Sequence, residues 1–453
     1  MEKFFELKER GTDVKTEIMA GITTFMTMAY ILAVNPIILG ASGMNTGAIF
    51  TATALASALA TFLMAFLANM PFVLSAGMGL NAYFAYTVVI GMGYTWQQAL
   101  AAIFVEGVVF IFLSLVNIRE AIFNAIPPSL KVAVGVSIGL FICFIGLQNA
   151  HIVVDGVTLV KLYSFKESFA NGMFQSEGIT VLLALIGLLI TAFLIIKNVK
   201  GAVLFGIVIT WGFGMICQSL GFYVPNPEKG FFSLFPNGII SMPASLEPTF
   251  MQVDFSSVFS FEFFTILMAF LFVDLFDTIG TVIGCATKAN LLDENGRLPK
   301  VKQVLLTDAI GTTAGSFLGT STITTFVESS AGIAEGGKTG LTALTAGCLF
   351  LLALFFSPVF LAIPAFATAP ALIIVGFLMM QQVSKIHWTD DTLTAIPAYI
   401  TIFSMAFMYS ISEGICFGVI SYTILHVFAG KGKDVTPLMY ILTLLFILKY
   451  IFL

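Results

Sequence analysis

The stretch that decides the fold is residues 266–284, ILMAFLFVDLFDTIGTVIG, which is long and apolar enough to cross a membrane yet carries two acids. Asp274 and Asp277 are three residues apart, so on a helix their side chains lie on one face. A charged group at the centre of a bilayer costs about 2.5–3.5 kcal/mol even on insertion scales, and such groups persist where they face protein or a wet cavity. The stretch therefore predicts a membrane-spanning helix with a functional site on its buried face.

The composition of the whole chain supports a membrane protein. Of its 453 residues, 58% are hydrophobic and 10% are charged, whereas soluble proteins carry about 25% charged residues. Between Ile18 and Val105 there is no Asp, Glu, Lys or Arg. That interval is long enough for three or four crossings of about 20 residues each. A soluble globular fold is excluded.

Hydrophobic windows predict fourteen membrane spans. The ninth and tenth are rich in Thr, Ser and Gly, so we expect poor helices surrounded by protein or by a water-filled cavity. The apolar segment 435–453 is either an interfacial helix, which we favour, or a fifteenth crossing. The fourteen windows are 18–38, 47–69, 72–91, 97–116, 129–149, 178–196, 201–220, 258–284, 303–320, 322–340, 341–363, 365–383, 393–410 and 411–429.

The distribution of basic residues predicts the orientation. With a cytoplasmic N-terminus, the outer loops carry only Lys161, Lys166 and Lys229 of the 20 Lys and Arg residues, and Lys449 lies in the C-terminal apolar segment. All other basic residues then fall on the inner side, as the positive-inside rule requires. We therefore expect a multi-pass protein of the cell membrane with both termini cytoplasmic.

The chain also contains a weak internal repeat. The sequence VLSAGM at 73–78 resembles VESSAGI at 327–333, and seven spans separate the two copies, so the second enters the membrane inverted. The β-branched run at 322–327 suits an extended strand, which we expect to pair with residues 72–74. Glu328 would lie where this strand gives way to a helix, with half-helix N-termini directed at the site. The expected fold is all-α, with short strands interrupting spans three and ten.

Several polar residues in the spans could carry the chemistry. Asp274 and Asp277 are too close for both to ionise comfortably in a low dielectric, so the pair is suited to binding a proton; the alternative is a structural pair with a neighbouring cation. Asn81 offers donors and an acceptor to a heterocycle edge; the alternative is an Asn that caps a helix or bonds another helix. Asp308 either orients the site or caps a helix, and Glu106 binds a neighbouring helix.

Aromatic residues near these motifs could stack on a planar substrate or simply pack. They are Tyr30, Tyr83, Phe84, Phe276 and Phe326.

Motifs spread over most of the chain resemble the AzgA-like purine permeases, a branch of the nucleobase/ascorbate transporter superfamily. They are AGITTF at 20–25, MAYI at 28–31, VNP at 34–36, GMGLNA at 77–82, DLFDTIGT at 274–281, GTST at 319–322, ESSAG at 328–332 and APALI at 369–373.

The resemblance implies fourteen spans in a 7+7 inverted repeat. Spans one to four and eight to eleven (1–116 and 258–363) would form a core domain, and the remaining spans (117–257 and 364–453) a gate domain. A purine would bind between the domains, beside the strands.

By motif match the substrate contacts would be Asn81, Asp274 and Glu328, with Ala76, Phe326 and Ser329 beside them. Asp277 occupies the position of an acid used by uracil permeases, which have a histidine four residues later where this chain has Thr281. Asp277, Asp274 and Asp308 are the proton-coupling candidates.

The expected function is import of adenine, guanine or hypoxanthine by proton symport, by motion of the core against the gate. Sodium is the less favoured coupling ion. The expected partners are a purine base and the lipid bilayer, with no cofactor, no metal and no nucleic acid, and a homodimer is left open. The alternatives are a uracil, xanthine or anion carrier of the same fold, or a channel. No nucleophile–base pair, metal cluster or nucleotide loop indicates an enzyme.

Overall fold

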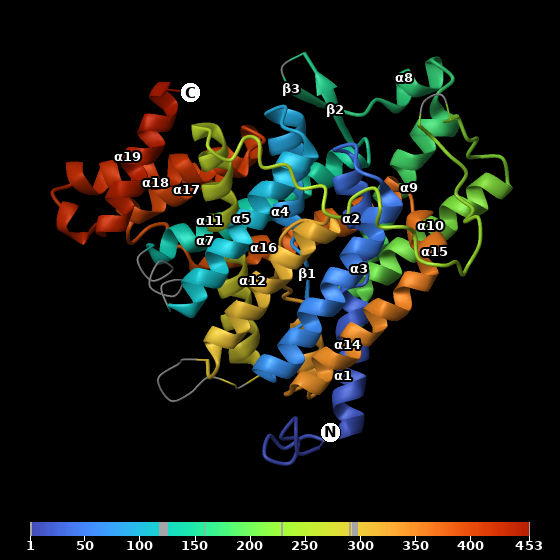
Figure 1. Cartoon of the computed structure of the whole chain (residues 1–453). Helices are drawn as coiled ribbons and strands as arrows, with labels where there is room; N and C mark the ends of the chain where they lie inside the picture. The colour runs from blue at the N-terminus through green and yellow to red at the C-terminus, as the bar shows by residue number, and fades with distance from the viewer. Residues whose placement is uncertain are drawn as a thin grey trace.

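The computed structural model describes residues 2–116, 126–157, 159–227, 230–289, 291 and 298–452, and these are mostly helical (Figure 1). The first half contains α1 (Val14–Met28), α2 (Ile31–Gly40), α3 (Thr46–Leu63) with the π-helix η1 (Met64–Ala68), β1 (Leu74–Ala76), α4 (Met78–Ala82) with the π-helix η2 (Tyr83–Gly91), α5 (Trp96–Leu115), α7 (Pro128–Asn149), β2 (Val153–Gly156), β3 (Leu159–Leu162), α8 (Phe165–Ala170), η3 (Phe174–Gly178), α9 (Ile179–Ile196) and α10 (Ala202–Ser219).

The second half begins with the longest described helix. It contains α11 (Phe261–Lys288), α12 (Val301–Leu318), β4 (Ile323–Thr325), α13 (Ser329–Ala334), α14 (Gly340–Ala353) with η5 (Leu354–Phe356), α15 (Ser357–Leu361), α16 (Ala365–Met380) with η6 (Gln381–Lys385), α17 (Thr392–Phe407), α18 (Ile411–Phe428), η7 (Gly432–Asp434) and α19 (Pro437–Phe452).

Each predicted span coincides with helix, or with helix interrupted by strand, in the described ranges. Nine helices among the described residues are long and apolar enough to cross a membrane. They confirm a multi-pass membrane protein, whereas the count of fourteen crossings stays a prediction. The prediction that span nine is a poor helix is wrong, because α12 is a regular helix of 18 residues. Its Thr and Ser side chains do not break it: the Thr307 and Thr313 hydroxyls donate to carbonyls one turn earlier, so their polar atoms are satisfied inside the helix.

Helix starts follow the capping residues of the sequence. Asp13 precedes α1, and its Oδ1 accepts from the Thr16 backbone N–H at 3.0 Å. This hydrogen bond lowers the pKa of the Asp13 carboxyl. Thr95 and Gln98 form a capping box at the start of α5. The caps satisfy donors that a helix leaves unpaired at its N-terminus.

The two halves of the chain meet in a short antiparallel sheet. β1 pairs with β4, with Leu74 opposite Thr325, Ser75 opposite Thr324 and Ala76 opposite Ile323. The expected pairing is confirmed, but the predicted strand at 72–74 lies two residues too early. The Val73 N–H donates to the Ser329 hydroxyl at 3.0 Å instead of to a strand carbonyl, so the ladder starts at Leu74. Every residue of both strands is buried.

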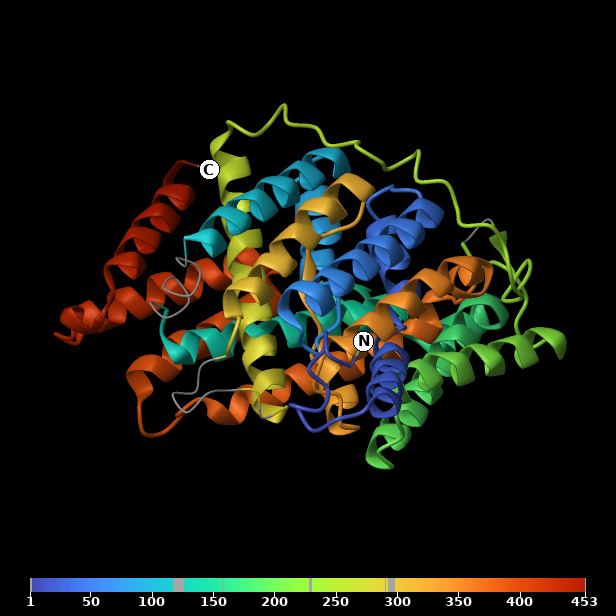
Figure 2. The ribbon, with the colours of Figure 1, turned by 60° about the horizontal axis from the view of Figure 1, so that its bottom comes forward.

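The helices pack in two sets around this sheet. In one set α1 packs on α13 and α14, α3 packs on α2, α12 and α14, and α5 packs on α12. In the other α7 packs on α16 and α17, α9 packs on α10 and α16, and α17 packs on α18. Figure 2 shows the second set on both flanks of the first. The boundaries predicted for a core and a gate domain stay a prediction.

The C-terminal helix packs along α18. Thr443 donates to the Thr423 hydroxyl at 2.8 Å, and Lys449 forms an ion pair with Glu413 at the start of α18. The two helices therefore run antiparallel, which explains how a lysine is accommodated in an apolar helix. In Figure 1 the C-terminus lies at the opposite end of the molecule from the N-terminus. On which side of the membrane each terminus lies stays a prediction.

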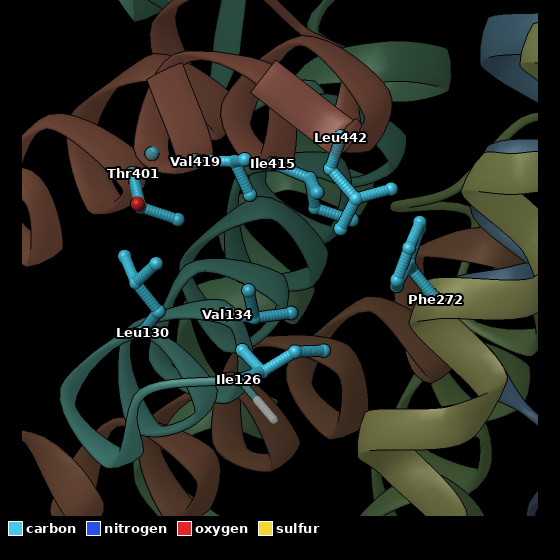
Figure 3. Close-up of a pocket in the computed structure, with 9 residues that line it drawn as sticks. Ile126, Leu130, Val134, Phe272, Thr401, Ile415, Val419 and Leu442 are labelled. Atoms are coloured by element: carbon cyan, nitrogen blue, oxygen red, sulfur yellow. The ribbon is translucent and has the colours of Figure 1, made fainter. Parts of the chain in front are cut away.

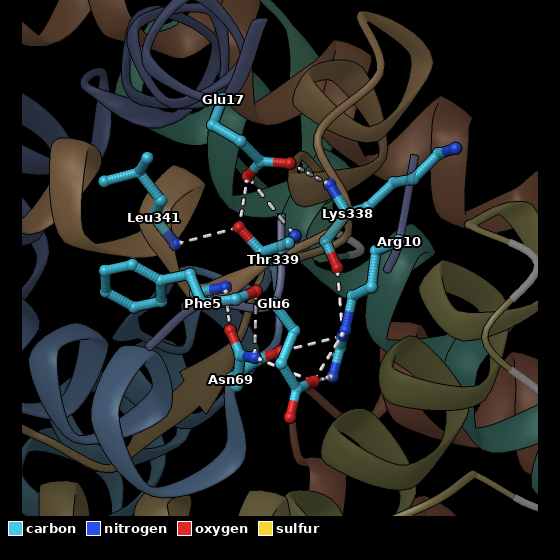
Figure 4. A network of polar contacts seen from close by, with 9 residues as sticks. Phe5, Glu6, Arg10, Glu17, Asn69, Lys338, Thr339 and Leu341 are labelled. Atoms are coloured by element: carbon cyan, nitrogen blue, oxygen red, sulfur yellow. Dashed lines mark hydrogen bonds and ion pairs between the residues drawn. The ribbon is translucent and has the colours of Figure 1, made fainter. Parts of the chain in front are cut away.

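A polar network ties the N-terminal segment to the start of α14 (Figure 4). Glu17 of α1 is fully buried and accepts from the backbone N–H groups of Lys338, Thr339 and Thr342 at 2.8, 3.2 and 3.2 Å. The hydroxyls of Thr339 and Thr342 donate to it as well, at 2.8 and 2.6 Å. Asn69 accepts from the Gly340 N–H at 2.8 Å. A buried carboxylate with five donors is fully satisfied, so this network is structural.

Candidate functional site

The site is built where the β1–β4 sheet meets α11. Glu328 precedes α13 and accepts a hydrogen bond from the Tyr30 hydroxyl at 2.7 Å. Tyr30 lies between α1 and α2 and is 1% exposed, whereas Glu328 is only partly buried. A rigid, buried donor thus fixes one carboxylate oxygen of Glu328. As expected, this residue lies where the strand of span ten gives way to a helix.

Asp277 lies on the same side of the sheet. Its Oδ2 accepts from the Thr324 hydroxyl of β4 at 3.4 Å, and it is within electrostatic range of Asp274 and Glu328. The structure therefore brings together acids that are 51 residues or more apart between α11 and span ten. Carboxylates gathered in a low dielectric favour proton binding, because both burial and like charge disfavour the ionised form.

Asp274 is joined to the neighbouring helix through a hydroxyl of its own helix. It is fully buried and accepts from the Thr278 hydroxyl at 2.8 Å. The same hydroxyl lies 3.1 Å from Oδ2 of Asp308 on α12, which is also fully buried. Of the two roles left open for Asp308, the structure places its side chain within the helix rather than at a cap.

Asn81 makes its hydrogen bonds inside the protein. Its Oδ1 accepts from the Ser321 hydroxyl, and its Nδ2 lies 3.4 Å from the Ala76 carbonyl. Asn81, Ala76 and Ser321 are all fully buried. In this conformation Asn81 of α4 links span three to the non-helical segment between α12 and β4 in span ten, rather than to another helix.

The remaining predicted residues surround the strands. Ser329 is buried and bonds Val73 as described, and Phe326 is 6% exposed. Tyr83 and Phe84 belong to the main hydrophobic core, where the Tyr83 ring contacts Phe270 edge-on with centroids 4.8 Å apart. The side chain of Phe276 lies outside the described residues. Of the candidate aromatics, Tyr30 has a direct bond to a site acid.

Several partners were missed from the sequence. They are hydroxyl residues: Thr278, Ser321, Thr322 and Thr324. Thr322 donates to Glu106 at 2.8 Å, so Glu106 contacts the extended part of span ten rather than only a helix. The signal available was the density of Thr and Ser in spans eight and ten, which places a hydroxyl near each buried acid.

A hollow lies elsewhere in the molecule. It is lined mainly by apolar side chains from α7, α11, α18 and α19, together with Thr401 of α17, as Figure 3 shows. None of the predicted site residues lines it. Among the residues that the structure describes, no group of three or more His, Cys, Asp or Glu is arranged to hold a metal ion.

A bundle of apolar helices, with acids gathered beside a short two-stranded sheet that the two halves of the chain form together, is typical of a membrane transporter. The sequence model described as "Permease family" matches residues 15–417, and the chain belongs to this family. It is therefore a transporter and not an enzyme. The predicted resemblance is confirmed at the level of the family.

Two curated relatives span nearly the whole chain. The guanine/hypoxanthine permease PbuG of Bacillus subtilis is 44% identical over 100% of both chains. The adenine permease AdeP of Escherichia coli is 41% identical over 100% of this chain and 96% of its own. Among solved structures, the transmembrane domain of the cyanobacterial bicarbonate transporter BicA aligns with a TM-score of 0.64 at 13% identity, over 88% of this chain and 97% of that one. The last likeness confirms the fold alone.

Proposed function

We propose that this protein imports purine nucleobases across the cell membrane by proton symport. The observation that carries the proposal is the Tyr30–Glu328 hydrogen bond beside the β1–β4 sheet. Tyr30 occupies one carboxylate oxygen of Glu328 and leaves the other to accept from ring N–H groups of a base. The names of the relatives, permeases for adenine and for guanine/hypoxanthine, support purines as the substrate class.

The remaining predicted residues would complete the purine site. Asn81 would bond the ring edge once its contact with Ser321 opens, while Ala76, Ser329 and Phe326 shape the site beside the strands. Asp274 lies at the end of the site toward α12. The proton would be held by Asp277, Asp274 and Asp308, because carboxylates this close gain by protonation when a neutral base binds.

Transport would occur by alternating access, with a core (1–116 and 258–363) moving against a gate (117–257 and 364–453). Several contacts cross that boundary in the described chain. They include hydrogen bonds of Thr51 to the Ala244 carbonyl and between Ser241 and Ser357, and an ion pair between Lys200, which lies between α9 and α10, and Glu335 at the end of α13. Such a pair on the surface contributes little free energy, about 0–1 kcal/mol, so it can break during each cycle.

An anion carrier of the same fold is the second candidate, because the aligned solved structure is a bicarbonate transporter. The acids at the site oppose it, since Asp274, Asp277 and Glu328 would repel an anion. A uracil or xanthine carrier differs only in the base that it selects.

The test is uptake and binding by the purified protein in proteoliposomes. We expect saturable uptake of labelled adenine or hypoxanthine, competition by other purines, and weak competition by uracil and bicarbonate. An inward pH gradient should drive accumulation, and an uncoupler should abolish it. Accumulation that a sodium gradient sustains alone would refute proton coupling, and uptake that does not saturate would indicate a channel.

A further inference from the structure

A single hydroxyl joins two buried acids on neighbouring helices. Thr278 is one turn beyond Asp274 on α11, and its Oγ lies 2.8 Å from Oδ1 of Asp274 and 3.1 Å from Oδ2 of Asp308 on α12. All three residues are fully buried. Both distances are those of ordinary hydrogen bonds between oxygens.

The number of protons decides what this geometry means. A threonine hydroxyl has one hydrogen, so it can donate to one carboxylate at a time. The second oxygen–oxygen contact is a hydrogen bond only if the other carboxyl carries a proton and donates it to Oγ. With both acids ionised, two negatively charged oxygens would face one hydroxyl that can satisfy one of them.

We propose that Thr278 is a positioning residue that lets Asp274 and Asp308 share one transported proton across the α11–α12 contact. This deepens the proton symport proposed above and rests on it. Two linked proton transfers exchange the two arrangements. When Thr278 donates to Asp274, Asp308 is protonated and donates to Thr278. As the Asp308 proton passes to Oγ of Thr278, the hydroxyl proton passes to Asp274, so that Asp274 now donates to Thr278 and Thr278 donates to Asp308. The pair holds one proton in both states and none is created or lost.

The surroundings contain further titratable groups that any proton measurement must consider. Asp277 lies on α11 and Glu328 at the start of α13, and Glu106 of α5 is bonded to Thr322. None of these three is bonded to Thr278 in the described hydrogen bonds. Substitution of Thr278 therefore perturbs the Asp274–Asp308 pair directly, and the other acids only through their electrostatic interaction with that pair.

The experiment measures protons and adenine together, with a pH indicator and labelled adenine in the same proteoliposomes. Thr278→Val removes the hydroxyl at nearly constant volume and should lower the ratio of protons to adenine by at least half and the accumulation of adenine about tenfold. Thr278→Ser keeps the hydroxyl and should restore both. Asp308→Asn supplies an amide N–H that can donate to Thr278 but cannot release it, so accumulation should also be lost.

The matched control is Thr307→Val. Thr307 is buried beside Asp308 on the same helix, but its hydroxyl donates to the Gln303 carbonyl of its own helix at 2.8 Å. This variant should keep the wild-type ratio of protons to adenine.

The outcomes separate this inference from the proposed function. If the wild type shows no proton-driven accumulation, the proposed symport itself is refuted. If the wild type accumulates adenine and Thr278→Val keeps its ratio, the sharing of a proton through Thr278 is refuted. A loss in Thr278→Val that Thr278→Ser does not restore would mean that the position serves packing, and would overturn the proposal equally.

Discussion

Two glutamates, the fully buried Glu17 and the partly buried Glu328, differ in how many hydrogen bonds their carboxylates accept. Glu17 accepts five hydrogen bonds at the start of α14, three of them from backbone N–H groups. Glu328 accepts one side-chain hydrogen bond among the described residues, from Tyr30. A carboxylate that accepts from five protein donors has no capacity left for a ligand, whereas one with a single side-chain donor retains it. The number of donors, rather than burial, distinguishes the structural acid from the acid that we propose binds substrate.

Of the substitutions that test this difference between the two glutamates, Glu328→Gln should have the greatest effect, which is a loss of transport. With Tyr30 donating to the amide oxygen, the amide nitrogen would face the purine N–H groups and cannot accept from them. Hydrogen bonds to a charged group contribute about 1.5–3 kcal/mol each. We expect binding of adenine or hypoxanthine to weaken at least about 100-fold, which calorimetry of the purified protein would measure. Normal uptake by this variant would remove Glu328 from the site.

Glu17→Gln should do the reverse and damage stability without damaging binding. The amide nitrogen would face N–H donors of Lys338, Thr339 and Thr342, so we expect the free energy of unfolding to fall by about 2 kcal/mol. A lower melting temperature of the detergent-solubilised variant would show it, while the Kd for purine stays at the wild-type value. A changed base preference would mean that Glu17 communicates with the site.

Tyr30→Phe should have a smaller effect on binding. The loss of one hydrogen bond to the carboxylate, about 1.5 kcal/mol, predicts roughly tenfold weaker purine affinity. The matched control is Tyr94→Phe, because the Tyr94 hydroxyl donates to Glu262 at 3.0 Å in an exposed pair. Equal effects of the two substitutions would show that Tyr30 does not position Glu328.

The smallest expected effect is that of Asn69→Gly. Asn69 has a φ of 54°, in the left-handed region that glycine adopts freely. The substitution therefore removes the bonds to Gly340 and Phe5 without adding backbone strain, and we expect a loss of roughly 0.5–1 kcal/mol of stability. A loss as large as that in Glu17→Gln would mean that the network depends on the amide rather than on the carboxylate.

The sequence predicted the general architecture well because the physical signals are strong. Apolar length decides the membrane spans, and a β-branched run decides the strand in span ten. The strand in span three was misplaced by two residues, because the Ser329 hydroxyl that ends the ladder comes from 256 positions away. The membrane count and the domain boundaries remain predictions.

At the site, the sequence identified the acids but not what each contacts. Glu328 and Asp277 meet Tyr30 and Thr324, whereas Asn81 is engaged by Ser321. Residues that pair over such separations leave no local sequence pattern from which the pairing could be predicted.

The close packing at Gly332 is also invisible in the local sequence. A Cβ there would collide with the Thr24 hydroxyl and the Ala20 carbonyl. The motif ESSAG therefore records a close approach of α13 to α1 that only the fold reveals.

The antiparallel ladder between β1 and β4 has a consequence for the order of folding. Each strand is three residues long, and its partner comes from the other half of the chain. Until the second half is inserted, the backbone of β1 has no strand partner, and an unsatisfied polar group in hydrocarbon costs several kcal/mol. We therefore expect the first half to complete its fold only after β4 has been synthesised and inserted.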